Sequence, residues 1–141
     1  MSSAVGMMTV NTYEAIRLTL LSSATIRDAV GDRVYAAYLD EVQPSQFPCI
    51  TYKVGGGFTD SDAPAVSSFS VAIWVWVKTN NTDAYVLYGE VLDLLNRQLV
   101  QQVGVRLQFK ETRRPLEVIE PTTRALGVVG RFTILGVAVT A

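Results

Sequence analysis

The amino-acid sequence predicts an α+β domain, in which a single, mostly antiparallel β-sheet carries two main α-helices on one face. The chain has 141 residues, a length that suits one compact domain. Two segments repeat their apolar residues at the helical spacing of three and four, and the segments between and after them have the composition and alternation of strands. This order is typical of the α+β class. We expect the domain to span residues 11–141, after a flexible arm at residues 1–10 that lacks either period.

The N-terminal third predicts short elements around one longer helix. The first helical segment repeats Tyr13, Ile16 and Leu20 at helical spacing. The next segment stops at Gly31, because glycine readily adopts the left-handed conformation that ends many helices. The expected elements are a helix over residues 12–23, a helical turn over 25–30, a turn with a brief strand over 31–35 and a loop over 36–47.

A long β-hairpin is expected in the middle of the chain. Its first strand, residues 49–54, is ended by three glycines at residues 55–57, and residues 58–66 form a polar loop. Its second strand, residues 67–78, is apolar on both faces, so both faces must be covered. Twelve strand residues reach about 40 Å, whereas a domain of this length is about 37 Å across. The hairpin is therefore expected to project beyond the domain.

The C-terminal half predicts one helix and the remaining strands. Thr82 is a suitable N-cap for a helix whose apolar residues recur at helical spacing. Pro115 and Pro121 bracket a short extended piece, and Gly130 and Gly136 predict bulges or bends in the last strand. The expected elements are a helix over residues 83–100 and strands over 105–112, 116–119 and 127–140.

The composition argues against several classes of function. Lys and Arg number 12 against 13 Asp and Glu, and this net charge of −1 argues against a basic nucleic-acid binder or a polybasic membrane-surface protein. The chain has no histidine and a single cysteine, Cys49, which leaves no His-dependent nucleophile, no His- or Cys-built zinc site and no internal disulfide. We therefore expect no catalytic residue, no metal and no cofactor, and a reducing compartment.

The apolar content is high for a protein without a membrane span. Apolar residues make up 49% of the chain, and the mean hydropathy is +0.25. The longest apolar run, Val71–Val77, is too short to cross a bilayer, and residues 1–10 lack the pattern of a secretion signal. We expect the surplus apolar surface to be buried against other copies of the chain.

Two segments resemble ligand-binding loops but lack the residues that those loops need. Gly55–Gly57 are not followed by the Lys-Ser or Lys-Thr of a phosphate loop. Asp60 and Asp62 lack the glycine and the glutamate that complete an EF-hand. The densest carboxylate region alternates with arginines near turns, which favours surface ion pairs over acid–base chemistry. Its members are Asp28, Asp32, Asp40 and Glu41.

The two tryptophans and a group of arginines are candidates for contacts between subunits. Trp74 and Trp76 leave their strand on the same side, where they form either a second part of the core or interface anchors. With both main helices on the other face, a monomer would leave them exposed. Arg113, Arg114 and Arg124 form either a charged edge that prevents stray strand pairing or intersubunit salt bridges.

Four features, in order along the chain, resemble a known family. Residues 26–30 (IRDAV) end the first helical region, GDRVY follows at residues 31–35, and FPCITY opens a strand at residues 47–52. A long apolar strand then leads into the helix expected over residues 83–100. This pattern, spread over residues 12–100, is similar to that of the tail-terminator family of long-tailed bacteriophages, also called tail completion or head–tail joining proteins.

The resemblance implies a non-enzymatic structural protein of a phage or prophage virion. Members of that family cap the growing tail tube as a ring, usually of six subunits, stop its polymerisation and present the surface that joins the filled head. The implied partners are further copies of the chain, the major tail tube protein and a head-completion or connector protein, with neither a membrane nor sequence-specific nucleic acid among them. A monomer before assembly, and a location at the head–tail junction of the virion, are both consistent with this role.

The polar loop of the hairpin completes the set of candidate contacts. Residues 55–66 are expected to be mobile in the free subunit and to become ordered on assembly. The candidate contacts with neighbouring subunits or with the tail tube are Phe58, Asp60, Asp62, Trp74, Trp76, Arg113, Arg114 and Arg124.

Two other functions stay open at this point. One is a small-molecule-binding or enzymatic α+β domain with a pocket near Trp74 and Trp76. The other is a different head–tail connector or a minor tail component.

Overall fold

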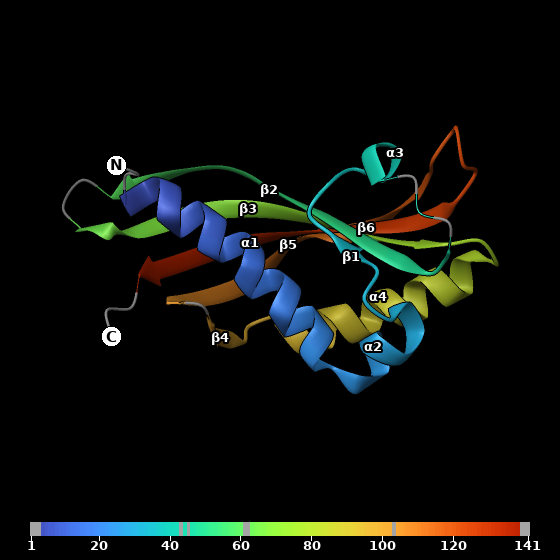
Figure 1. Ribbon diagram of the computed structural model, residues 1–141, viewed down its shortest axis with the longest axis horizontal. Coiled ribbons are helices and arrows are strands. Elements are labelled where there is room, and N and C mark those ends of the chain that lie inside the picture. Colours follow the sequence, from blue (N-terminus) through green and yellow to red (C-terminus); the bar gives the residue numbers. More distant parts are fainter. Residues whose placement is uncertain (1–3, 43, 45, 61–62, 103, 139–141) are drawn as a thin grey trace.

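The computed structural model has the α+β fold that the sequence predicts, with one six-stranded sheet in the order β1-β2-β3-β6-β5-β4 (Figure 1). It describes residues 4–42, 44, 46–60, 63–102 and 104–138. Only β1 and β2 are parallel, and the other neighbours are antiparallel. The elements are α1 Ala4–Ser22, α2 Ala24–Val30, β1 Val34–Tyr35, α3 Leu39–Val42, β2 Cys49–Asp60, β3 Ala63–Val77, α4 Asn81–Leu95, β4 Leu99–Gln102, β5 Val105–Ile119 and β6 Leu126–Ala138.

The first helix is longer than the sequence predicts. It begins at Ala4, so residues 4–10 belong to α1 and the expected arm at residues 1–10 is wrong for them. Alanine and methionine in this stretch have high helix propensity, and extending an existing helix is far easier than starting one. Residues 1–3 lie outside the described residues. The next helix, α2, is capped by the hydroxyl of Ser23 and ends at Gly31 with φ of 64°, as expected for that glycine.

Helix α4 is shorter than predicted. Asn80 caps it instead of Thr82, because the Asn80 side chain accepts a hydrogen bond from the Asp83 amide. The expected end at residue 100 is wrong, since the helix stops at Leu95 and Val100 lies in strand β4, paired with Leu107 of β5. The apolar residues at the end of the helical pattern belong to strand β4 instead. Pairing between strands therefore outweighs helical spacing at this point.

The central hairpin is more regular than predicted. Strand β2 continues to Asp60 and β3 begins at Ala63, so the glycines at residues 55–57 do not end the first strand. The loop expected over residues 58–66 is likewise a pair of strands on either side of residues 61–62, which lie outside the described residues. The glycines absorb a register shift between Gly55 and Phe58. The described residues of this segment are therefore strands and not a polar loop, and their order in the free subunit stays a prediction.

Strand β5 includes the extended piece that was expected to be separate. It runs from Val105 to Ile119 against β6 with register shifts on both sides of Arg113, and Pro115 lies in the second shift. Gly130 and Gly136 keep regular register with β3, so no bulge forms there at either glycine, although the shift between Arg113 and Leu116 lies opposite Gly130. The irregularity belongs to the part of β5 beyond its pairing with β4, where proline costs no ladder hydrogen bond.

The main core lies between the sheet and helices α1, α2 and α4. It contains the inward side of β3, namely Phe69, Val71, Ile73, Val75 and Val77, as the alternation predicts. A smaller cluster forms on the opposite face of the sheet, where Leu39 of α3 covers Cys49 and Trp76. Figure 1 shows the short helix α3 set apart from α2 and α4. The second apolar face of the long strand is thus partly covered within the subunit itself.

The ends of the sheet are defined by its two long hairpins. The tip of the β2–β3 hairpin lies beside the end of β6, because Val66 pairs with Val137. The β5–β6 turn lies at the other end, where Val77 pairs with Leu126. The expected projection of the β2–β3 hairpin is modest, since Figure 1 shows helix α1 running alongside it toward the N-terminus. No helix in the described part of the chain is long and apolar enough to cross a membrane.

Candidate functional site

The two motifs at residues 31–35 and 47–52 pair with each other. Val34 and Tyr35 form the parallel strand β1 against Ile50 and Thr51 of β2. The Ile50 amide also donates to the Arg33 carbonyl at 3.0 Å. The motifs therefore build one edge of the sheet.

Arg33 ties these motifs together through its guanidinium. Its Nε donates to the Pro48 carbonyl at 2.9 Å, and its other nitrogens donate to the carbonyl of Ala29 and to the side chain of Gln46, each at 3.3 Å. One side chain thereby joins the end of α2 to the start of β2. Because these bonds satisfy main-chain carbonyls, Arg33 has a structural role, and the motifs position the surfaces around them.

Trp76 is part of the interior of the subunit. Only 6% of it is exposed, and its indole N–H donates to the Thr51 hydroxyl at 2.9 Å. The expectation that a monomer leaves it uncovered is wrong, because α3 and its flanking segments pack over this end of the sheet. Trp74 is half-buried and makes an edge-on contact with the Tyr38 ring, with 5.6 Å between centroids. Of the two tryptophans, Trp74 alone borders the surface.

Beyond α3, the outer face of the sheet is open and carries a basic groove. The groove has a volume of about 460 Å³, and its charged side chains are Lys53, Arg113 and Arg131. Trp74 and Tyr38 line one of its walls. Lys53 lies 4.0 Å from Glu41 of α3 and above the Tyr38 ring. We call this set of three cations with Trp74 the basic groove.

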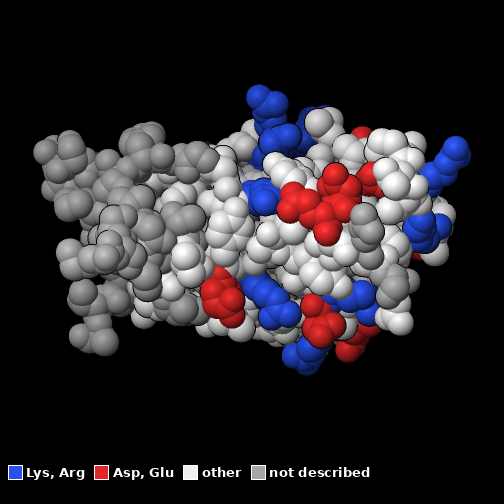
Figure 2. Space-filling view, turned by 45° about the horizontal axis from the view of Figure 1, so that its top comes forward, with Lys and Arg blue, Asp and Glu red and all other residues white. Residues whose placement is uncertain are grey.

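A second hollow, also lined by basic side chains, lies toward the opposite edge of the sheet. Arg97, just after α4, and Lys110 of β5 line it together with Gln108, Thr133 and Leu135. Among the described residues that line these two hollows there is no aspartate or glutamate. Acidic residues of this side lie at and near α3, namely Asp40 and Glu41 of α3 and Glu120, which lines a further hollow with Trp74 and Trp76. Figure 2 shows the side of the molecule with α3, where a compact acidic group stands next to separate basic side chains.

The remaining candidate contacts do not form one site with the basic groove. Arg114 lies in the bulged part of β5, and Arg124 lies in the β5–β6 turn with φ of 58°. Phe58 and Asp60 belong to the far end of β2, and their side chains are outside the described part, as is all of Asp62. Among the described residues of the predicted set, Trp74 and Arg113 line the basic groove, and Trp74 and Trp76 line a separate hollow beside α3.

Sequence reasoning missed three of the cations on this face, namely Lys53, Lys110 and Arg131. Their strand alternation places them opposite the core, and this signal is present in the sequence. The sequence does not show the order of the strands in the sheet. The three cations lie on one face near each other because the order is β2-β3-β6-β5. The grouping of charges therefore depends on topology.

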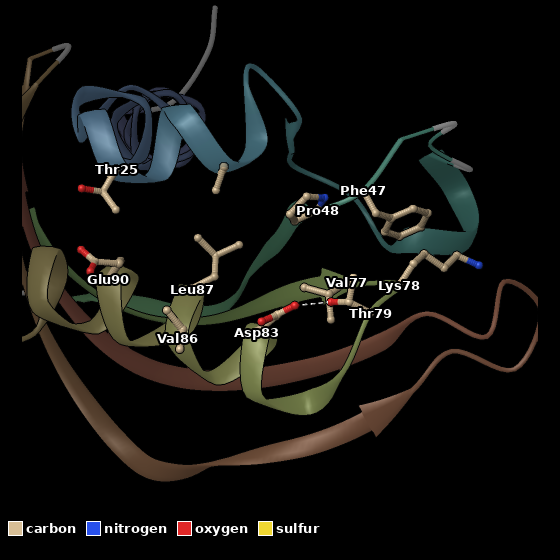
Figure 3. Close-up of a pocket in the computed structure, with 11 residues that line it drawn as sticks. Thr25, Phe47, Pro48, Val77, Lys78, Thr79, Asp83, Val86, Leu87 and Glu90 are labelled. Atoms are coloured by element: carbon tan, nitrogen blue, oxygen red, sulfur yellow. Dashed lines mark hydrogen bonds between the residues drawn. The ribbon is translucent and has the colours of Figure 1, made fainter.

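A second, apolar groove lies between α2, α4 and the segment before β2 (Figure 3). Its volume is about 410 Å³. Phe47, Pro48 and Leu87 form its apolar lining, while Asp83 and Glu90 stand on the α4 side. The Asp83 carboxylate accepts a hydrogen bond from the Thr79 hydroxyl at 2.5 Å, so that group is engaged in the start of the helix.

Burial keeps the ionisable side chains Cys49 and Tyr88 uncharged. Burial raises the pKa of the Cys49 thiol to about 12. Burial, together with a 2.6 Å hydrogen bond to Glu111, raises the pKa of Tyr88. No group of three or more potential metal-binding side chains occurs among the residues that the structure describes.

Comparisons with known proteins give matches among solved structures. No family model matches the sequence, and no curated protein matches it. Among solved structures, the fold is similar to a chain of the virion of a native gene transfer agent particle, with a TM-score of 0.71 and 16% sequence identity. The match covers 93% of this chain and 98% of that chain. The two chains therefore share a fold over almost their whole lengths.

Proposed function

We propose that this chain is a non-enzymatic structural protein of a phage or phage-like virion. The observation that carries the proposal is the fold shared with a chain of a gene transfer agent virion over 93% of the present chain. The paired motifs at residues 31–35 and 47–52, which resemble those of tail terminators, support the same assignment.

The specific role that we propose is that of a ring at the end of the tail tube. The ring stops tube polymerisation and presents the surface that joins the head. A ring needs two different patches on each subunit, because each copy meets the next in the same orientation. The open sheet face and the helix-covered face offer two such patches, which differ in charge and in shape. The partners are other copies of the chain, the tail tube protein and a head connector.

Assembly in the presence of tail tubes tests this role. Light scattering or native mass spectrometry of the concentrated protein, with and without tubes, measures its oligomeric state. Electron micrographs of the same mixtures show whether the protein occupies tube ends. We expect rings under at least one of the two conditions. A protein that stays monomeric in both and never decorates tube ends contradicts the proposal.

Electron microscopy also separates this role from that of another head–tail component. A connector protein binds the head vertex, and a minor tail protein binds elsewhere along the tail. Labelled protein found at either place, and absent from tube ends, would favour those roles.

A second candidate function follows from the apolar groove between α2 and α4. A groove of about 410 Å³ with Phe47, Pro48 and Leu87 in its lining is large enough for a small apolar ligand. An apolar fluorescent dye, displaced by candidate ligands, measures such binding. Saturable binding that the Leu87→Asp substitution abolishes, in a protein that does not assemble, would favour this alternative.

A further inference from the structure

We infer that consecutive copies meet by docking the outer face of α4 of one subunit onto the basic groove of the next. This inference rests on the proposed ring and assigns its subunit interface. We define the acidic helix face as Tyr85, Val86, Gly89, Glu90 and Asp93 of α4. The partner is thus a second copy of this chain, recognised by charge and by exposed apolar area.

The basic groove contains a like-charge pair that has no carboxylate of its own. Arg113 of β5 and Arg131 of β6 are direct cross-strand partners. Like charges in this relation disfavour the strand pairing. Among the described residues, no carboxylate lies within 4.0 Å of either guanidinium, since the one ion pair there joins Lys53 to Glu41. An anionic group from outside the subunit would relieve this repulsion.

The acidic helix face has the complementary charge. Helix α4 carries Asp83, Glu90 and Asp93 and contains no lysine or arginine. It also exposes large apolar side chains, with 65% of Val86 and 39% of Tyr85 exposed. Trp74 at the wall of the basic groove offers apolar area to receive them. The two faces therefore match in charge and in apolar content.

Gly89 gives independent support for close contact at this face. Glycine is the least favourable helix residue after proline, yet Gly89 lies in the middle of α4. A Cβ added there would meet no atom within 4 Å, so the packing of the subunit itself does not need glycine at this position. The missing side chain at Gly89, between Tyr85 and Asp93, instead allows another backbone to approach the helix.

The positions of the two faces fit a ring. Helix α4 packs on the core side of the sheet, and the basic groove lies on the opposite side. Opposite faces of one subunit cannot meet in a two-fold dimer of identical patches. They make a head-to-tail contact, which closes into a ring or continues as a filament.

Charge reversal tests the interface in two separate variants. The sheet variant is Arg113→Glu with Arg131→Glu, and the helix variant is Glu90→Arg with Asp93→Arg. Each variant alone places like charges across every contact, and we expect at least a tenfold loss of association. An equimolar mixture restores opposite charges at contacts between unlike subunits. We expect the mixture to assemble into alternating rings with equal numbers of both variants, measured by native mass spectrometry with and without tail tubes.

Matched controls separate the interface from general effects of charge. Arg27→Glu with Arg106→Glu makes the same change in net charge as the sheet variant, at residues outside the basic groove and the acidic helix face, and should assemble like the wild type. Circular dichroism verifies the fold of every variant. If a reversed variant does not fold, the neutral pairs Arg113→Gln with Arg131→Gln, and Glu90→Gln with Asp93→Asn, replace the reversed ones. Each neutral pair should weaken association and reduce its salt dependence.

The outcomes distinguish the interface from the proposed ring. A wild type that never assembles contradicts the ring and the interface together. A wild type that assembles, with both reversed variants assembling equally well alone, overturns the interface and leaves the ring intact. Loss of DNA binding in the sheet variant, with assembly unchanged, would also overturn it and would assign the basic groove to nucleic acid.

Discussion

Gly127 and Gly130 lie where aromatic rings press against the backbone of β6. A Cβ on Gly127 would come within 2.6 Å of the Trp76 ring. A Cβ on Gly130 would overlap the Tyr88 hydroxyl and ring. The sequence singled out Gly130, but not Gly127, as a special position. At both glycines the cause is side-chain packing from the two faces of the sheet. Packing partners from distant segments are not visible in the local pattern.

The Gly130→Ala substitution should destabilise the subunit by about 1–3 kcal/mol, because Tyr88 must leave its position and its hydrogen bond to Glu111. Urea denaturation measures the free energy of unfolding. Gly89→Ala is the control, since its Cβ meets no atom within 4 Å. A free energy of unfolding unchanged by Gly130→Ala would contradict this account of the packing.

The thiol of Cys49 should be inert in the folded protein. Burial raises its pKa to about 12, so the thiol stays protonated at pH 8. Trp76 and Leu39 also cover it. We expect no reaction with Ellman's reagent at pH 8 in the native state and one thiol per chain in urea. The raised pKa also means that this group favours folding less as the pH rises above about 9, the ordinary value for the thiol. Rapid labelling of the native protein would contradict the burial.

At the scale of elements, a tyrosine side chain forms hydrogen bonds with the free edge of strand β2. Beyond Thr51, the short strand β1 no longer pairs with β2. The Tyr13 hydroxyl of α1 accepts from the Val54 amide at 3.0 Å and donates to the Val54 carbonyl at 3.1 Å. The Tyr52 hydroxyl donates in turn to the Tyr13 carbonyl at 2.7 Å. These bonds attach α1 to the hairpin and satisfy an edge that would otherwise accept another strand.

The Tyr13→Phe substitution should cost about 1 kcal/mol, because both polar groups of Val54 lose their partner. The exchange of the Val54 amide hydrogen should become faster, as measured by nuclear magnetic resonance. Tyr38→Phe is the matched control, since Tyr38 contributes ring contacts to Trp74 and Lys53. Equal exchange rates at Val54 in the wild type and in Tyr13→Phe would show that the hydroxyl does not protect this edge.

The sequence predicted most elements but not all of their limits. Alternation located the strands because every second side chain from Phe69 to Val77 of β3, and from Val105 to Phe109 of β5, enters the core. Helical spacing continued past Leu95 although the chain turns there, at Arg97 with φ of 60°, to form β4. That turn depends on β5, which the local pattern of α4 does not contain. Glycines at residues 55–57 were likewise misread because a paired neighbour stabilises an otherwise weak strand.

The candidate site could be predicted only in part, because it too depends on contacts between distant segments. Two of the candidate contacts, Trp74 and Arg113, line one exposed groove, whereas Trp76 is covered by α3. A four-residue helix such as α3 has no detectable period, so its cover over Trp76 could not be anticipated. The groove itself needs the order β2-β3-β6-β5, which the sequence alone does not specify.

At the scale of the whole molecule, the charges are separated although the net charge is only −1. Two hollows of the open sheet face are lined by cations, a third hollow beside α3 is lined by Asp40 and Glu120, and α4 carries only acidic charges. A basic groove and an acidic helix on opposite faces of one subunit favour head-to-tail assembly over two-fold pairing. Near-neutral composition and strong local charge are thus compatible in one small domain.

The Gly89→Ala substitution should separate folding from assembly. Alanine in place of glycine should stabilise the free subunit by up to about 1 kcal/mol, because the helix gains propensity and the new methyl group meets open space. The same methyl group should weaken subunit association if α4 is approached closely. Thermal unfolding measures the first effect and native mass spectrometry the second. Stronger association in the variant would contradict a close contact at Gly89.

The length distribution of tails tests the proposed terminator role most directly. Particles produced by a phage or phage-like element that encodes this chain can be compared in electron micrographs with and without its gene. Without the chain, we expect tails of irregular length that lack heads, and we expect the purified protein to restore uniform, head-joined tails. Uniform, head-joined tails formed in the absence of the chain would contradict the central claim.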